Sequence, residues 1–166
     1  TANNNTAVGY AALNANTTGD DNTAIGYQAL ADNTTGGANV AVGDRALANN
    51  TTNHSNLAIG NLALFTQTSD GTKNVAVGNQ SLYSNTTGDY NIAVGDSSLY
   101  TNTTGGSNIS IGDYAMGLNT TGSNNAAVGK SVLAANTTGS NNTGVGYRAL
   151  DANTTANDNT ALGYAA

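Results

Sequence analysis

One unit of about 17 residues recurs along the whole chain and limits the folds open to it. The unit reads N-x-A-[VI]-G-x-x-A-L-x-x-N-T-T-G-x-x, and its positions are numbered from the opening Asn. Eight of the nine intervals between opening residues are 17 residues long and one is 18. The opening residues are Asn5, Asn22, Asn39, Asn56, Asn74, Asn91, Asn108, Asn125, Asn142 and Asn159. Such regular repetition indicates a single solenoid array over residues 1–166.

The short period decides between the solenoid classes. The common helical repeats need 33 to 47 residues, and leucine-rich repeats need at least about 20 residues and an L-x-x-L-x-L pattern that is absent here. Gly, Asn and Thr, which fill the unit, also have low helix propensity. Position five is Gly in all ten copies, and position four is always a branched apolar residue. The sequence therefore predicts an all-β parallel β-solenoid of ten coils.

Each unit has two candidate strands joined by two bends. Positions two to four form the first, as in Val75, Ala76 and Val77. Positions seven to eleven form the second, which includes Arg45 and Leu47. Gly at position five suits a tight bend because it has no Cβ, and N-T-T-G supplies residues typical of turns.

Stacked coils would place equivalent side chains about 4.8 Å apart in ladders, and ten coils would make a rod of roughly 45 to 50 Å. Asn side chains can hydrogen-bond along such ladders. The opening Asn residues form one predicted ladder, and the Asn residues at position twelve form a second. The second set consists of Asn16, Asn33, Asn50, Asn85, Asn102, Asn119, Asn136 and Asn153.

Alternation along the first strand gives it two apolar or small-residue faces. Positions two and four share one face, while the Ala at position three lies on the other. One face can fill the coil interior, which leaves the other for a partner, so we expect a homo-oligomer. The chain starts and stops within a unit, which predicts either a fragment of a longer fibre or subunits that stack end to end.

Composition excludes several partners. The net charge is −6, with ten Asp and only four cations, so no basic stripe exists for a nucleic acid backbone. The chain has no Cys, hence no disulfide framework and no Cys nucleophile. No apolar run approaches the roughly 18 residues of a membrane helix.

Residues that could support catalysis or metal binding are sparse. His54 is the only imidazole, and no Cys or Glu accompanies it, so we interpret it as a solvated turn residue and expect no enzyme. Among the Asp residues, Asp96 and Asp113 recur in register. Calcium between coils is an alternative for these carboxylates, but their expected role is solubility, and no cofactor is predicted.

The Asn-Thr-Thr segments have three interpretations. Each position-twelve Asn listed above begins an N-x-T sequence, the acceptor of N-glycosylation, although an Asn-Thr turn that satisfies its own backbone explains the same pattern. The Thr columns also raise an ice-binding alternative. Adjacent Thr residues point to opposite sides of a strand, which opposes a flat hydroxyl array.

Aromatic residues also recur in register. Tyr10 and Tyr27 occupy equivalent positions on neighbouring coils, and so do two further pairs, Tyr83 with Tyr100 and Tyr147 with Tyr164. We expect each pair to stack, either to stabilise the solenoid or to contact a carbohydrate or a surface.

The segment Asn91-Ile92-Ala93-Val94-Gly95 resembles the head repeats of trimeric autotransporter adhesins, and it is also similar to repeat segments of phage tail fibres. The resemblance covers essentially the whole chain, although the N-T-T-G turn makes this unit longer than the family's usual one. It implies a left-handed parallel β-roll of three chains, a location outside the cell or on a virion, and a structural or adhesive role on a host surface. A glycan-decorated filament and an ice-binding solenoid are the alternatives.

Overall fold

The computed structural model describes residues 1–68 and 71–166. It contains ten three-residue strands, one at positions two to four of each unit. They are β1 (Thr6–Val8), β2 (Thr23–Ile25), β3 (Val40–Val42), β4 (Leu57–Ile59), β5 (Val75–Val77), β6 (Ile92–Val94), β7 (Ile109–Ile111), β8 (Ala126–Val128), β9 (Thr143–Val145) and β10 (Thr160–Leu162). The predicted first strand is confirmed.

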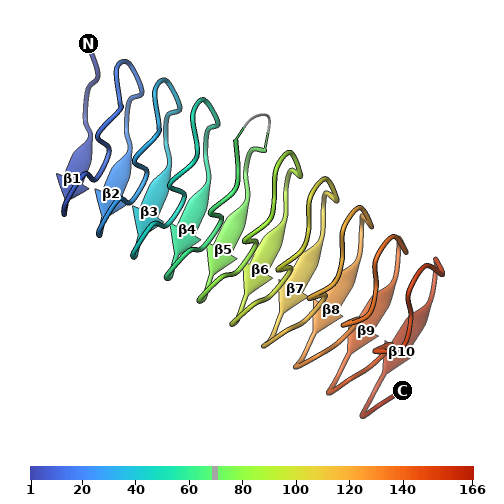
Figure 1. Ribbon diagram of the computed structural model, residues 1–166. Coiled ribbons are helices and arrows are strands. Elements are labelled where there is room, and N and C mark those ends of the chain that lie inside the picture. The colour runs from blue at the N-terminus through green and yellow to red at the C-terminus, as the bar shows by residue number, and fades with distance from the viewer. Residues whose placement is uncertain (69–70) are drawn as a thin grey trace.

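All ten strands form one parallel sheet in chain order, from β1 to β10. Each residue pairs with its equivalent in the next unit, as in Val75 with Ile92 and Val77 with Val94. The coils stack into a rod with the chain termini at opposite ends (Figure 1). The predicted parallel β-solenoid is therefore confirmed, with nine complete turns between the first strand and the last. The longer 18-residue interval includes Ser69 and Asp70, which lie outside the described residues.

The glycine at position five turns the chain sharply after each strand. Gly95 has a φ of +133°, in the region that L side chains rarely adopt. A Cβ added there would lie 2.6 Å from the carbonyl carbon and oxygen of Gly112 in the next coil. Because stacked backbones approach this closely at the bend, only glycine fits.

The predicted second strand is wrong. Positions seven to eleven form turns rather than a strand, and the residues at positions seven and nine are left-handed. Arg45 and Leu47 have φ values of 51° and 53°, a conformation that costs a non-glycine residue about 1 to 2 kcal/mol. Inter-coil hydrogen bonds fix it: the Arg45 N–H donates to the Tyr27 carbonyl at 2.8 Å, and the Leu47 N–H to the Ala63 carbonyl at 2.9 Å.

The interior of each coil is filled by small strand residues and one larger side chain. The Ala at position three points inward, and Ala24, Ala58 and Ala93 are fully buried. Opposite them, the Leu or Met at position nine forms a column of buried side chains. The fully buried members are Leu30, Leu47, Leu64, Leu82, Leu99, Met116 and Leu133. The structure thus settles which strand face fills the interior: the small one.

Candidate functional site

The opening Asn residues form a continuous hydrogen-bonded ladder inside the solenoid. The Asn91 Oδ1 accepts a hydrogen bond from the Asn108 backbone N–H at 3.1 Å, and the Asn91 Nδ2 donates to the Gly105 carbonyl at 2.8 Å. Asn74 acts on Asn91 in the same way. Each side chain therefore replaces a backbone acceptor between coils and also ties the start of its own coil to its closing turn.

The position-twelve Asn residues form the second ladder. The Asn102 Nδ2 donates to the Asn85 Oδ1 at 2.8 Å and to the Gly105 carbonyl at 2.9 Å. Six of the eight residues proposed as glycan acceptors are fully buried: Asn33, Asn50, Asn85, Asn102, Asn119 and Asn136. Since a glycan attaches to Nδ2, the folded coil offers these atoms to internal partners and not to solvent.

This second ladder is interrupted within the coil of the 18-residue interval, between Asn56 and Asn74. Gln67 takes the place of Asn, and its Nε2 donates to the Gly71 carbonyl within its own turn. The Asn50 Oδ1 has no partner among the described residues, and neither does the nearby Asn53 Nδ2. The substitution therefore explains why the hydrogen-bond chain stops at Asn50.

The first Thr of each N-T-T-G turn uses its hydroxyl internally. The Thr103 Oγ1 donates to the Thr120 carbonyl at 3.0 Å, and the Thr120 Oγ1 donates to the Thr137 carbonyl at 3.0 Å. These donors strengthen the stacking of the turns. These hydroxyls are therefore not free to order water, which counts against an ice-binding array in this Thr column. The second Thr of the turn, as at Thr104, Thr121 and Thr138, is exposed.

The outer face of the sheet carries the branched residues of positions two and four. Ile109 and Ile111 are each 41% exposed on β7, and Ile25 is 40% exposed on β2. Because the strands are in register, the position-four side chains form one apolar ladder along the whole rod. The position-two side chains form a second ladder that is apolar from β3 to β8 and consists of Thr in β1, β2, β9 and β10. We call the side chains at positions two and four of β1 to β10 the apolar stripe.

Aromatic rings stack between coils as expected from the sequence. The centroids of Tyr10 and Tyr27 are 5.3 Å apart, and those of Tyr83 and Tyr100 are 5.2 Å apart. Phe65 extends the latter stack, at 5.5 Å from Tyr83. Phe65 was not predicted to stack from the sequence, although it follows its opening Asn by the same spacing as Tyr83. Stacked rings cover one another's faces, so these ladders mainly stabilise neighbouring coils.

The polar residues singled out in the sequence do not converge. The exposed His54 accepts a hydrogen bond at Nδ1 from the Gly37 N–H at 2.9 Å. Asp96 accepts from Asn79, and Asp113 pairs with Lys130 at 2.8 Å, a hydrogen bond that raises the pKa of Lys130. Among residues 1–68 and 71–166, no group of three His, Cys, Asp or Glu side chains could hold a metal ion.

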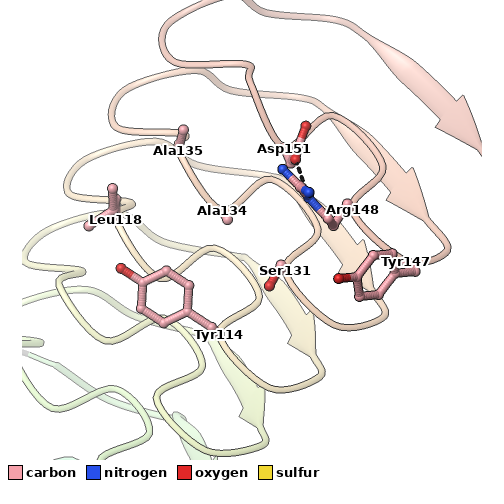
Figure 2. A pocket seen from close by; sticks show the side chains of 8 residues that line it. All are labelled: Tyr114, Leu118, Ser131, Ala134, Ala135, Tyr147, Arg148 and Asp151. Atoms are coloured by element: carbon pink, nitrogen blue, oxygen red, sulfur yellow. Dashed lines mark hydrogen bonds and ion pairs between the residues drawn. The ribbon is translucent and has the colours of Figure 1, made fainter. Parts of the chain in front are cut away.

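An open cleft of about 400 Å³ crosses three successive coils near the C-terminal end (Figure 2). Its floor belongs to the middle coil, where positions seven, ten and eleven carry the small residues Ser131, Ala134 and Ala135. Larger side chains of the two adjoining coils form the walls. They are Tyr114 and Leu118 on one side, and Tyr147, Arg148 and Asp151 on the other.

Comparison with known protein families, curated proteins and solved structures finds no match to this chain. The described part of the chain also has no helix that is long and apolar enough to cross a membrane. The function is therefore inferred from the apolar stripe, the Asn ladders and the cleft.

Proposed function

We propose that this chain is a non-catalytic structural segment of an extracellular fibre, and that it assembles laterally with copies of itself through the apolar stripe. The main support is that large branched side chains are exposed along the sheet, such as Val8 at 57% and Ile109 at 41%. An exposed apolar patch of a few hundred Å² on a protein surface is often a contact site.

The size of the stripe supports this role. Ten strands spaced about 4.8 Å apart, with positions two and four about 7 Å apart, give a surface of order 450 Å² once side-chain width is included. From β3 to β8 this surface is apolar at both positions, and Thr occupies position two of the outer strands. A stable interface buries about 800 Å² on each partner. The stripe would thus supply the apolar centre of an interface, and exposed neighbours such as Tyr90, at 53%, would extend it.

The periodicity of the stripe favours a second copy as the partner. Side chains that repeat at the strand spacing form ridges and grooves, and a surface with the same spacing can interdigitate with them over its full length. A trimer, which the resemblance to autotransporter heads implies, would bury the stripes of all three chains around one axis.

The internal ladders suit a load-bearing role. Hydrogen bonds between coils run along the rod in the sheet, in the Asn ladders and in the Thr turns. Each coil is therefore held to its neighbours at several points of its perimeter. This arrangement would give a stiff spacer or shaft, from which a surface or carbohydrate ligand could be contacted.

Sedimentation velocity on a charged variant of the stripe tests the proposal. Ile109→Lys places a cation in the stripe, and it should convert an oligomer to a single chain because the interface would bury an unpaired charge. Gln80→Arg is the matched control, since it adds the same charge at position seven, where Arg45 and Arg148 occur naturally. An unchanged oligomer in Ile109→Lys, or a wild-type monomer, would contradict lateral assembly through this face.

A further inference from the structure

The cleft is a consequence of side-chain size within an otherwise uniform array. Equivalent residues of the two wall coils are two strand spacings apart, about 9.6 Å, and the small floor residues leave the volume between them open. A volume of about 400 Å³ lies within the range of small-molecule sites, about 300 to 1,000 Å³. The walls are therefore spaced to admit one flat or ring-shaped group.

One wall presents a tyrosine that the backbone holds in place. The Tyr114 ring lies over Gly117, where a Cβ would come within 2.7 Å of the Tyr114 Cε2. Other coils carry Phe65, Tyr83 or Tyr100 at this position. Gly117 thus makes room for the ring to pack flat against the coil, with 38% of Tyr114 still exposed.

The opposite wall presents a second tyrosine with one covered face. Tyr147 stacks on Tyr164 of the next coil, with centroids 5.2 Å apart. On its other side the equivalent residue is Lys130, whose Nζ pairs with Asp113 at 2.8 Å. Tyr147 lines the cleft and is 42% exposed.

An ion pair supplies both kinds of hydrogen-bonding group beside this ring. The Arg148 Nε donates to the Asp151 Oδ2 at 2.6 Å (Figure 2). This bond uses one of the five guanidinium N–H donors and one of the two carboxylate oxygens, and both side chains remain partly exposed. The remaining guanidinium N–H groups and the Asp151 Oδ1 can bind a ligand that both donates and accepts hydrogen bonds.

We propose that this cleft binds a pyranose unit of a carbohydrate. Sugar hydroxyls donate and accept at adjacent atoms, which matches the paired guanidinium and carboxylate, and the C–H face of the ring can pack on a tyrosine. The paired charges cancel, which disfavours a phosphate or another anion, and the ion pair disfavours a purely apolar ligand. The site goes beyond the shaft function, because its residues lie at positions six to eleven and the stripe at positions two and four.

Saturation-transfer NMR with methyl glucopyranoside, galactopyranoside and mannopyranoside and with N-acetylglucosamine tests the site on the full chain. The repeat supplies tolerated substitutions for the cleft. Arg148→Gln matches the natural Gln28 and Gln80 at position seven, and Ala134→Tyr fills the cleft with the residue that position ten carries elsewhere as Tyr83. Arg45→Gln and Ala31→Tyr make the same changes in coils without the cleft and serve as matched controls, because Ala31 is half-buried at position ten as Ala134 is.

We expect at least one pyranoside to bind with millimolar affinity, to transfer saturation from the tyrosine rings, and to bind about tenfold or more weakly in Arg148→Gln and Ala134→Tyr. The two controls should bind as the wild type does. The proposal is overturned if no pyranoside binds at about 10 mM, or if the cleft variants bind as well as their controls. Sedimentation of the same variants should be unchanged, which separates failure of this site from failure of lateral assembly.

Discussion

Replacing Asn91 with Ala tests whether the opening Asn ladder holds neighbouring coils together. The change removes the Asn91 Nδ2 bond to the Gly105 carbonyl at 2.8 Å and both bonds that Asn108 donates to the Asn91 Oδ1 at 3.1 Å. Gly105 keeps the bond from Asn102, and the Asn108 Nδ2 keeps its bond to Gly122. The Asn108 backbone N–H loses its acceptor inside the solenoid.

The expected cost follows from this inventory. A buried donor left without a partner costs about 1 to 3 kcal/mol, and each further lost hydrogen bond costs about 1 kcal/mol. Asn91→Ala should therefore destabilise the array by roughly 3 kcal/mol. Asn102→Ala also removes three bonds, those that Asn102 donates to Asn85 and Gly105 and the one it accepts from the Asn119 Nδ2 at 2.8 Å. It leaves the buried Asn85 Oδ1 without this donor, so its cost should be similar, roughly 3 kcal/mol.

Urea unfolding and hydrogen exchange measure the two parts of this prediction. Cooperativity can break down in repeat arrays, so exchange at the Asn108 amide is the more local readout. A cost of about 3 kcal/mol corresponds to roughly a hundredfold faster exchange. Asn79→Ala, an exposed Asn bonded only to Asp96, is the control. If Asn91→Ala costs no more than this control, the ladder does not stabilise the stack.

Three further predictions concern packing and periodicity. Gly95→Ala should cost about 3 kcal/mol or more because its Cβ would meet backbone atoms 2.6 Å away at a positive φ. Gly106→Ser is the control in urea unfolding, since Ser123 and Ser140 occupy its position in other coils; its Cβ would lie 3.1 Å from the Asp89 carbonyl oxygen without a positive φ, so it should cost about 1 kcal/mol or less, and equal costs for the two variants would refute the close approach at Gly95. Gly144→Ala should cost about 1 to 3 kcal/mol because its Cβ would lie 2.5 Å from the Val132 Cγ1, and Val132→Ala should recover most of that loss; additive costs would refute the pairing. Deletion of residues 92–108 should keep the circular dichroism spectrum and shorten the rod by about 4.8 Å, while deletion of three residues within this coil should abolish folding; equal tolerance would refute a 17-residue structural unit.

The solenoid and its first strand were predictable because invariant columns report positions that every coil uses alike. Asn, Gly and the branched residue recur at fixed spacing, and a structure with identical layers places them in register. The two faces of the strand were also predictable from alternation. Which face points inward was not, because both faces are apolar or small, and the choice depends on how much space remains beside the Leu at position nine.

The second strand failed because its backbone conformation is rare for the residues that adopt it. Leu47 and Arg45 have positive φ values, which propensity argues against for any L-residue larger than Asn. Stacking overrides this preference, since every coil makes the same turn and each turn hydrogen-bonds to its neighbours. Repetition therefore reports that a conformation is shared, and not which conformation it is.

The cleft could not be found from the consensus because it exists where three coils depart from it. The residues that form the cleft are visible in the sequence. At position ten the three coils carry Gly117, Ala134 and Asp151, and at position seven the outer two carry Tyr114 and Arg148. To predict a cleft from them, one must know that positions seven and ten lie on the outside of a turn. That information comes only with the corrected conformation of positions seven to eleven.

Native mass spectrometry of the intact chain over a range of concentrations tests lateral self-assembly most directly. Burial of the apolar stripe between copies predicts a discrete species at three times the 16.5 kDa mass of one chain. A single-chain mass of 16.5 kDa at every concentration would show that the stripe is left uncovered and would contradict the proposed shaft.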